Sequence, residues 1–246
     1  MSQIFDHNAQ NLCCLCGSHG ELTGEHRIKA SSLASRFAWD ESVAIVSADR
    51  NIRPKLAQSR KSEHFHYKAP VCRTCNSDRT QQADQEFSRF DEVCQSLAEG
   101  NGHPTTVWED PTFKVGTSAR LNTLRYFEKS LACAIAESGG PRFLALTNFA
   151  IDRSDEEVVF LKIDRDPNFP RWQSKFSDSQ YAAHAGLEIQ FSRETNLLHE
   201  IRSGISLGAV RYTFSIGVEP VLARALKLHS PKFYGRGEMQ FLEASR

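Results

Sequence analysis

The chain has 246 residues, its 30 Lys and Arg balance 30 Asp and Glu, and 40% of it is hydrophobic. This length suits one large domain or a small domain followed by a medium one. The absence of net charge excludes a strongly basic coat, so any contact with an anionic polymer must use local charge. Residues 1–83 are mildly basic and residues 84–246 are mildly acidic.

The first twelve residues are polar and lack the apolar core and cleavage site of a signal peptide. No run approaches the roughly 18 apolar residues that a membrane helix needs. We therefore expect a soluble cytoplasmic protein with no membrane partner. The sequence also contains neither a P-loop nor a G-x-G-x-x-G fingerprint.

The first motif lies in residues 12–30, where Cys13 and Cys16 form a Cys-x-x-Cys pair followed by two glycines. This pattern predicts a knuckle that leads into a tight hairpin. Residues 31–68 show no clear periodicity but contain a basic stretch without acidic residues. Its charged members are Arg50, Arg53, Lys55, Arg60 and Lys61. Such a stretch is usually a solvated loop. This one lies between the first cysteine pair and a second pair, Cys72 and Cys75, and that position favours contact with a nucleic-acid backbone.

Periodic segments follow the second cysteine pair. Residues 84–99 predict an amphipathic helix that ends at Gly100, and residues 121–137 predict a second helix. The stretch between them is rich in Gly, Pro and Thr, and we interpret residues 106–118 as a linker. Three strand-like runs at 157–164, 186–191 and 205–218 come later, and the last has a half-buried alternation over Val210, Tyr212, Phe214 and Ile216. We expect an α+β protein with a zinc domain at 1–105 and an α+β domain at 119–246.

The cysteines predict a metal site. The chain has seven cysteines, and in a reducing compartment the pairs Cys13/Cys16 and Cys72/Cys75 favour metal over disulfides. Four thiolates close a tetrahedral zinc site without an open position, so the ion would be structural. Cys14 is an alternative ligand to Cys13. Cys94 and Cys133 lie on the expected helices, where small buried thiols are common.

In this order, CCLCG at 13–17, GEH at 24–26 and VCRTCNSDR at 71–79 resemble the zinc-containing branch of the HNH (ββα-metal) endonucleases. The resemblance covers about residues 12–80. It implies that His26 is the general base and that Glu25 and Asn76 bind a catalytic cation. The family's middle Asn, which braces the loop of the base, has no counterpart here, and His66 or His64 could replace it. No family is recognised in residues 119–246.

The chemistry of phosphodiester hydrolysis suits these residue types. A histidine with a pKa near ~6.5 can accept a proton from water at neutral pH. A carboxylate and an amide leave a hard cation with open positions for phosphate oxygens, which favours Mg²⁺ or Mn²⁺ over zinc. Arg73 and Arg79 flank the second pair and either contact phosphates or are solvated.

Two classes of function follow. The first is a metal-dependent DNA endonuclease, in restriction or anti-phage defence, in which residues 119–246 recognise a target, a protein partner or a second copy of the chain. The alternative is a non-catalytic zinc module that binds nucleic acid or protein, because the middle Asn is missing. Cleavage of RNA is a third option, since neither motif distinguishes the sugar.

Overall fold

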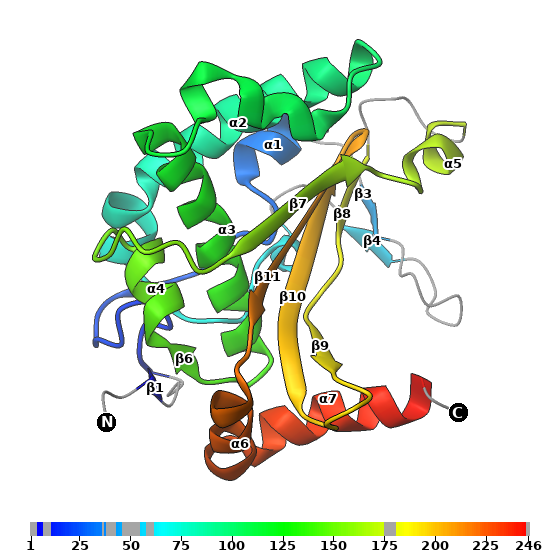
Figure 1. Ribbon diagram of the computed structural model, residues 1–246. Coiled ribbons are helices and arrows are strands. Elements are labelled where there is room, and N and C mark those ends of the chain that lie inside the picture. The colour runs from blue at the N-terminus through cyan, green and yellow to red at the C-terminus, as the bar shows by residue number, and fades with distance from the viewer. Residues whose placement is uncertain are drawn as a thin grey trace.

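The computed structural model describes residues 4–6, 11–35, 37, 43–45, 55–57, 62–174 and 181–244. They form a mixed α+β structure in which helices pack against a five-stranded antiparallel sheet (Figure 1). The α+β class expected from the sequence is therefore confirmed. Within the described part of the chain, no helix combines the length and apolar character needed to cross a membrane.

The sheet has the order β7-β11-β10-β8, and β9 pairs with another part of β10. Its strands are β7 (Phe160–Arg165), β8 (Ala182–His184), β9 (Glu188–Phe191), β10 (Leu198–Leu207) and β11 (Val210–Gly217). The alternation predicted for β11 is confirmed, since Val210, Tyr212, Phe214 and Ile216 are all buried. The run 205–218, however, is not one strand, because Gly208 adopts a φ of +53° and turns the chain from β10 into β11.

Two long helices, α2 (Gln81–Glu99) and α3 (Ser118–Glu137), cover one face of the sheet (Figure 1). Both predicted helices are confirmed, and both begin one turn earlier than the apolar pattern indicates. The start of α3 is explained by Thr117, whose hydroxyl accepts a hydrogen bond from the Arg120 N–H. The other described helices are α1 (Ala30–Ala34), α4 (Leu144–Ala150), α5 (Phe169–Gln173), α6 (Pro220–His229) and α7 (Pro231–Ala244).

Short strand pairs involve the N-terminal third of the chain. They are β1 (Phe5–Asp6) with β6 (Arg142–Phe143), β2 (Leu22–Thr23) with β5 (Val71–Cys72), and β3 (Val43–Ile45) with β4 (Lys55–Ala57). The first pair joins the N-terminus to the segment after α3. The second pair lies beside the cysteines and positions the candidate site described below.

The two regions expected from the sequence share one apolar core, which runs from Cys13 to Tyr234. At its centre the ring of Phe87 from α2 stacks on Tyr126 from α3 at 3.8 Å, and Phe87 also meets Tyr212 of β11 edge-on. The segment at 104–113 forms two short 3-10 helices, with Val107 and Phe113 buried. Cys94 and Cys133 are buried core residues, as predicted.

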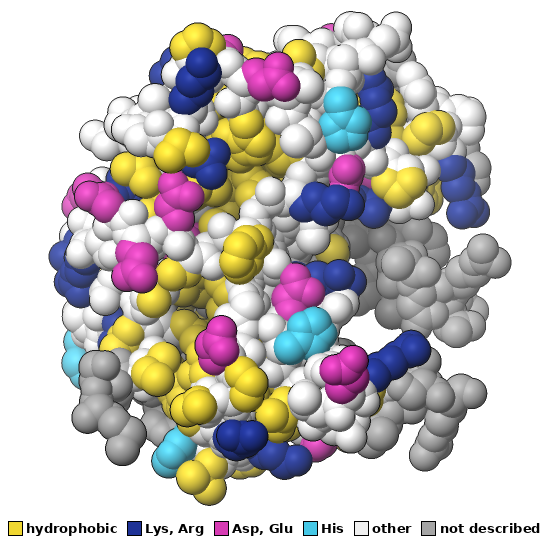
Figure 2. All heavy atoms as spheres, in the orientation of Figure 1, with side chains coloured by type: hydrophobic (Ala, Val, Ile, Leu, Met, Phe, Trp, Pro, Cys, Tyr) yellow, Lys and Arg dark blue, Asp and Glu magenta, His cyan; other side chains and the backbone are white. Residues whose placement is uncertain are grey.

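On the face shown in Figure 2, acidic and basic side chains are scattered among one another. This distribution agrees with the zero net charge of the sequence.

Candidate metal centre and adjoining polar site

The first cysteine knuckle is a tight turn closed by backbone hydrogen bonds. The Cys13 N–H donates to the Ser18 carbonyl at 3.0 Å, and the Gly17 N–H donates to the Cys13 carbonyl at 2.8 Å. Gly17 has a φ of +71°, and a side chain there would collide with the guanidinium of Arg142. The positive φ therefore favours glycine at this turn, whereas the Arg142 side chain could move aside.

The second knuckle is held by the small sheet and the start of the following helix. Cys72 lies on β5, opposite Leu22 of β2, and Cys75 lies in the first turn of a π-helical segment, η2 (Thr74–Arg79). The two knuckles are tied together because the Cys14 N–H donates to the Pro70 carbonyl at 2.8 Å. Two segments that are far apart in the sequence thus present their thiols to one another.

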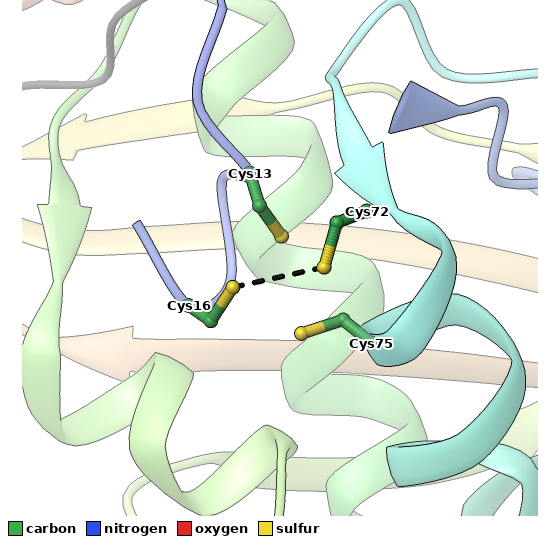
Figure 3. A group of neighbouring side chains, drawn as sticks. All are labelled: Cys13, Cys16, Cys72 and Cys75. Carbon is green, nitrogen blue, oxygen red and sulfur yellow. Dashed lines mark hydrogen bonds between the residues drawn. The ribbon is translucent and has the colours of Figure 1, made fainter. Parts of the chain in front are cut away.

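The four thiols of Cys13, Cys16, Cys72 and Cys75 point toward a common centre, with their Sγ atoms all within 4.8 Å of one another (Figure 3). The Sγ atoms of Cys16 and Cys72 are 3.7 Å apart. Tetrahedral zinc with bonds of ~2.3 Å places its sulfurs about 3.8 Å apart, whereas a disulfide needs about 2.05 Å. The seven cysteines are free. The cluster therefore fits a four-coordinate structural zinc ion.

Cys14 does not belong to the cluster. Its side chain turns away from the other thiols and lies 4.0 Å, sulfur to sulfur, from Cys133 of α3, with both residues buried. Cys13 is therefore the ligand at this knuckle, and the alternative that Cys14 replaces it is wrong.

Neighbouring groups lower the pKa values of Cys13 and Cys16 and so favour negative charge on these two sulfurs. A hydrogen bond from the Cys75 thiol lowers the pKa of Cys13 to about 4, and the same contact raises the pKa of Cys75. Arg79 donates to the Cys75 Sγ at 3.7 Å, and the Ser18 hydroxyl lies 2.8 Å from the Cys16 Sγ. Such contacts stabilise metal-bound thiolates.

Arg73 within the second knuckle and Arg79 after it have different surroundings. The guanidinium of Arg79 is directed at a cluster sulfur. That of Arg73 is 72% exposed and lies 3.4 Å from Glu21. Phosphate contact by either residue stays a prediction.

The Glu25-His26 dyad directly follows β2 and lies antiparallel to residues 65–67. The Tyr67 N–H donates to the Glu25 carbonyl and the Arg27 N–H donates to the Phe65 carbonyl, each at 2.7 Å. The rings of His26 and His66 are in contact, with centroids 3.9 Å apart and planes tilted by 43°. A side chain at Gly24 would approach the His66 Nδ1 to 3.1 Å. Of the two candidates for the bracing residue, His66 and His64, His66 is thus the one that lies beside the predicted base, His26.

His64, the other alternative, is exposed in a short 3-10 helix.

Asn76 lies in η2 and reaches back to the segment before the dyad. Its amide nitrogen donates to the Thr23 hydroxyl at 3.0 Å and to the Gly24 carbonyl at 3.2 Å. Both bonds use the nitrogen of the amide. The structure thus brings Asn76 next to the dyad.

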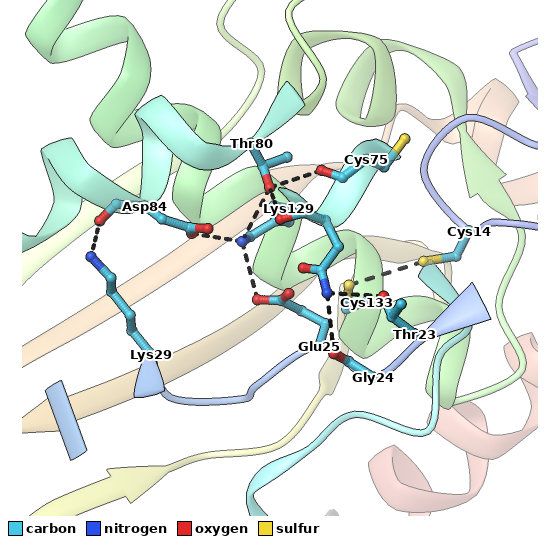
Figure 4. A network of polar contacts seen from close by, with 11 residues as sticks. Cys14, Thr23, Gly24, Glu25, Lys29, Cys75, Thr80, Asp84, Lys129 and Cys133 are labelled. Atoms are coloured by element: carbon cyan, nitrogen blue, oxygen red, sulfur yellow. Dashed lines mark hydrogen bonds and ion pairs between the residues drawn. The ribbon is translucent and has the colours of Figure 1, made fainter. Parts of the chain in front are cut away.

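The Glu25 carboxylate is engaged by a buried lysine from the second region of the chain. Lys129 of α3 has a fully buried side chain, and its Nζ lies 3.1 Å from the Glu25 Oε1 and 2.6 Å from the Asp84 Oδ1 (Figure 4). Thr80 lies 3.5 Å from the same ammonium. Lys29 donates to the Asp84 backbone carbonyl.

Lys129 and Asp84 were not found from the sequence, because the burial of Lys129 becomes evident only in the structure. Residues 123–135 of α3 are buried on every side of the helix, and many of them are apolar. A lysine in the middle of such a run has no solvent-facing position and needs a carboxylate partner. The partner itself could not be identified, because Glu25 and Asp84 lie far away in the sequence.

Burial and neighbouring charges shift the pKa values of this site. Burial raises the pKa of Glu25, and the Lys129 charge opposes that shift. Burial and the neighbouring His66 lower the pKa of His26 to about 4. Burial alone would lower the pKa of Lys129, but the charges of Glu25 and Asp84 outweigh it and raise that pKa. His26 is thus a neutral imidazole at neutral pH.

The basic stretch lies mostly outside the described residues. Arg50, Arg53, Arg60 and Lys61 are not described, and of Lys55 only the backbone is described, in β4. Their contact with nucleic acid stays a prediction.

Within the described ranges, the cysteine cluster is the single group in which three or more His, Cys, Asp or Glu side chains bring ligand atoms together. The chain matches no family model, and no curated protein or solved structure matches it. The resemblance to HNH endonucleases therefore rests on the motif residues of the sequence. What the structure establishes is a four-cysteine group consistent with structural zinc.

Proposed function

We propose that this protein is an HNH-type endonuclease that hydrolyses DNA phosphodiester bonds with one Mg²⁺ or Mn²⁺ ion. The observation that carries the proposal is the hydrogen bond from the Asn76 amide to the Gly24 carbonyl at 3.2 Å. It joins the residue after the second knuckle to the residue before Glu25 and His26. The HNH resemblance implies that His26 is the base and that Glu25 and Asn76 are the two ligands of the catalytic cation.

The order of the local elements supports the same proposal. The strands β2 and β5 pair antiparallel, and η2 and α2 follow directly after β5. Two strands and a helix around a cation site are what the ββα-metal resemblance implies. Zinc held by the four cysteines would keep the halves of this unit in place, since a structural ion can stabilise a small domain with little core of its own.

The chain's own residues have distinct tasks in this proposal. His26 accepts a proton from the attacking water, and the adjacent His66 ring limits its movement. Glu25 supplies a carboxylate oxygen, and Asn76 supplies its amide oxygen. A divalent ion bound there would neutralise charge on the phosphate and assist the leaving oxygen. Holding these groups in place before substrate arrives accounts for much of the rate that positioning can contribute.

The surrounding charges and the second region complete the proposal. Arg73 and Arg79, together with the basic stretch, would contact the phosphate backbone, which adds salt-dependent affinity. The sheet and its helices would recognise a target or a partner, in restriction or in defence against phage.

The second candidate is a non-catalytic zinc module that binds nucleic acid or protein. One observation favours it: the Glu25 carboxylate already has a charged partner, Lys129, at 3.1 Å. A carboxylate whose charge is balanced within the protein does not require a metal ion.

Incubation with supercoiled plasmid separates the two candidates. The zinc-loaded wild type should nick plasmid when Mg²⁺ or Mn²⁺ is added, and His26→Ala should be at least about 100-fold slower, as expected for the loss of a general base. The exposed His19 beside the first knuckle gives a matched control, because His19→Ala should nick like the wild type.

No nicking by the wild type, or equal nicking by His26→Ala, would remove the nuclease proposal. Single-stranded RNA of matched length, run in parallel, decides which nucleic acid is cut.

A further inference from the structure

Lys129 is a buried cation at the edge of the proposed catalytic site. It comes from the middle of α3, and its side chain is fully buried, whereas the side chains of Glu25 and Asp84 are 12% and 24% exposed. The two carboxylates thus separate the ammonium from solvent and keep partial access themselves. Lys129 cannot reach a nucleic-acid phosphate, so its charge acts through these two residues.

The distances show how the ammonium is shared. The Nζ lies closer to Asp84, at 2.6 Å, than to Glu25, at 3.1 Å, and it meets Glu25 through Oε1. The Glu25 side chain also accepts a hydrogen bond from the His26 backbone N–H. The ion pair between Asp84 and Lys129 can persist when Glu25 binds another cation. Two carboxylates and one ammonium leave a single net negative charge for such a cation.

We propose that Lys129 is a positioning residue that acts as a resident counter-cation of Glu25 and limits how tightly Glu25 binds a divalent ion. The inference rests on the proposed function, in which Glu25 is a ligand of the catalytic cation. An ammonium and a divalent ion on the same carboxylate repel each other, and this repulsion is strong where water is largely excluded. The helix α3 of the second region is then part of the catalytic centre.

This role predicts a direction that a merely structural role does not. If Lys129 only supported the fold, its removal would loosen Glu25 and weaken cation binding. If Lys129 competes with the cation, its removal leaves Glu25 and Asp84 to bind the cation together, and binding becomes tighter. A tighter complex with fewer open positions should also turn over more slowly.

The test is a titration of the zinc-loaded full chain with Mn²⁺, followed by the electron paramagnetic resonance signal of free Mn²⁺. Lys129→Met keeps the length of the side chain and removes its charge, and we expect Mn²⁺ affinity to rise at least about tenfold. Glu25→Gln should abolish this binding. Lys68→Met removes an exposed lysine and is the matched control without effect. Zinc content and the circular dichroism spectrum show that each variant is folded.

A second variant keeps Lys129 in place. Asp84→Asn leaves the ammonium with Glu25 as its single charged partner, so Mn²⁺ affinity should fall about tenfold. If Lys129→Met does not fold, the Mn²⁺ affinities of Asp84→Asn and Lys129→Gln test the inference instead. Unchanged affinity in Asp84→Asn, or unchanged or weaker affinity in a folded Lys129 variant, would overturn the inference.

The same titration distinguishes failure of this inference from failure of the proposed function. If the wild type binds Mn²⁺ through Glu25 and the folded Lys129 variants do not bind it more tightly, the counter-cation role alone is lost. If the wild type neither binds Mn²⁺ nor nicks plasmid while Lys129→Met binds Mn²⁺, the nuclease proposal fails and the counter-cation role stands. If none of these proteins binds Mn²⁺, both are wrong.

Discussion

Two neighbouring sites in this protein are built in different ways. The cysteine cluster consists of two local turns, each with a Cys-x-x-Cys pair, and its four sulfurs face one another. The Glu25 site depends on distant segments, because its carboxylate is held by Lys129 of α3 and its neighbour Asn76 comes from η2. The first is defined by spacing in the sequence and the second by tertiary packing. Removal of a single ligand should therefore disrupt the cysteine cluster, whereas changes in the charge of side chains should alter the Glu25 site.

The largest effect is expected at the cysteine cluster. Cys13→Ser should release zinc and lower the free energy of unfolding by more than about 5 kcal/mol, since structural zinc contributes roughly 10–16 kcal/mol in small zinc domains. The neighbouring Cys14 provides the matched control, because its thiol faces Cys133 and not the cluster. Elemental analysis of both variants measures the zinc. Loss of zinc from Cys14→Ser, or its retention in Cys13→Ser, would contradict the assigned ligands.

A smaller but still large effect is expected from the charge network. Lys129→Met leaves two carboxylates without their buried partner, which should cost about 3–5 kcal/mol in urea unfolding. Adding Glu25→Gln removes one of those charges, so the double variant should be destabilised by less than the sum of the single variants. Additive effects would show that the two residues do not interact, and the contrast between the two sites would then fail.

Glu128, one position before Lys129, differs from Glu25 because it is buried and forms no ion pair within the described part of the structure. Its Oε1 accepts hydrogen bonds from the N–H groups of Val158 and Val159, and its Oε2 has no partner among the described residues. Burial raises the pKa of Glu128 to about 8, above its ordinary value of 4.5. The folded state therefore binds the proton more tightly than the unfolded state does.

The sign of the pH dependence follows from that difference. The stability contributed by protonated Glu128 is fully present below pH 4.5 and is lost as the pH rises to about 8, by up to about 1.4 kcal/mol per pH unit. Glu128→Gln imitates the protonated form, so its unfolding free energy should fall less than that of the wild type over this range. Parallel pH profiles of the two proteins would contradict the burial of an ionisable carboxyl.

The smallest effects are expected at the two arginines beside the second knuckle. Arg79→Met removes the donor to the Cys75 sulfur, so zinc should transfer to a chelator several-fold faster than from the wild type. Arg73→Met removes an exposed side chain and should change stability by less than about 0.5 kcal/mol. Equal zinc release from both variants would mean that the Arg79 contact does not support the cluster.

The sequence predicted the parts of the molecule that depend on local patterns. The spacing of the cysteines indicated the cluster, and the apolar period over Phe87, Phe90 and Cys94 indicated α2. The alternation from Val210 to Ile216 indicated β11. In each case the sequence signal lies within a few residues or repeats with one period along the segment.

Features that depend on tertiary packing were not predictable. The pairing of Lys129 with Glu25 and Asp84 requires α2, α3 and the segment after β2 to meet, and no local pattern encodes that meeting. The hairpin at Gly208 was hidden inside a continuous strand-like run, because glycine there provides a turn that the neighbouring apolar residues obscure. The contact between the His26 and His66 rings depends on the antiparallel placement of residues 25–27 and 65–67.

Anomalous X-ray scattering from crystals of the full chain soaked in Mn²⁺ tests most directly whether this protein has two metal sites with separate tasks. We predict a zinc-edge peak among the Sγ atoms of Cys13, Cys16, Cys72 and Cys75, and a separate manganese-edge peak between the Glu25 carboxylate and the Asn76 amide oxygen. Manganese that binds nowhere near Glu25, or cysteines that hold no zinc, would contradict the account.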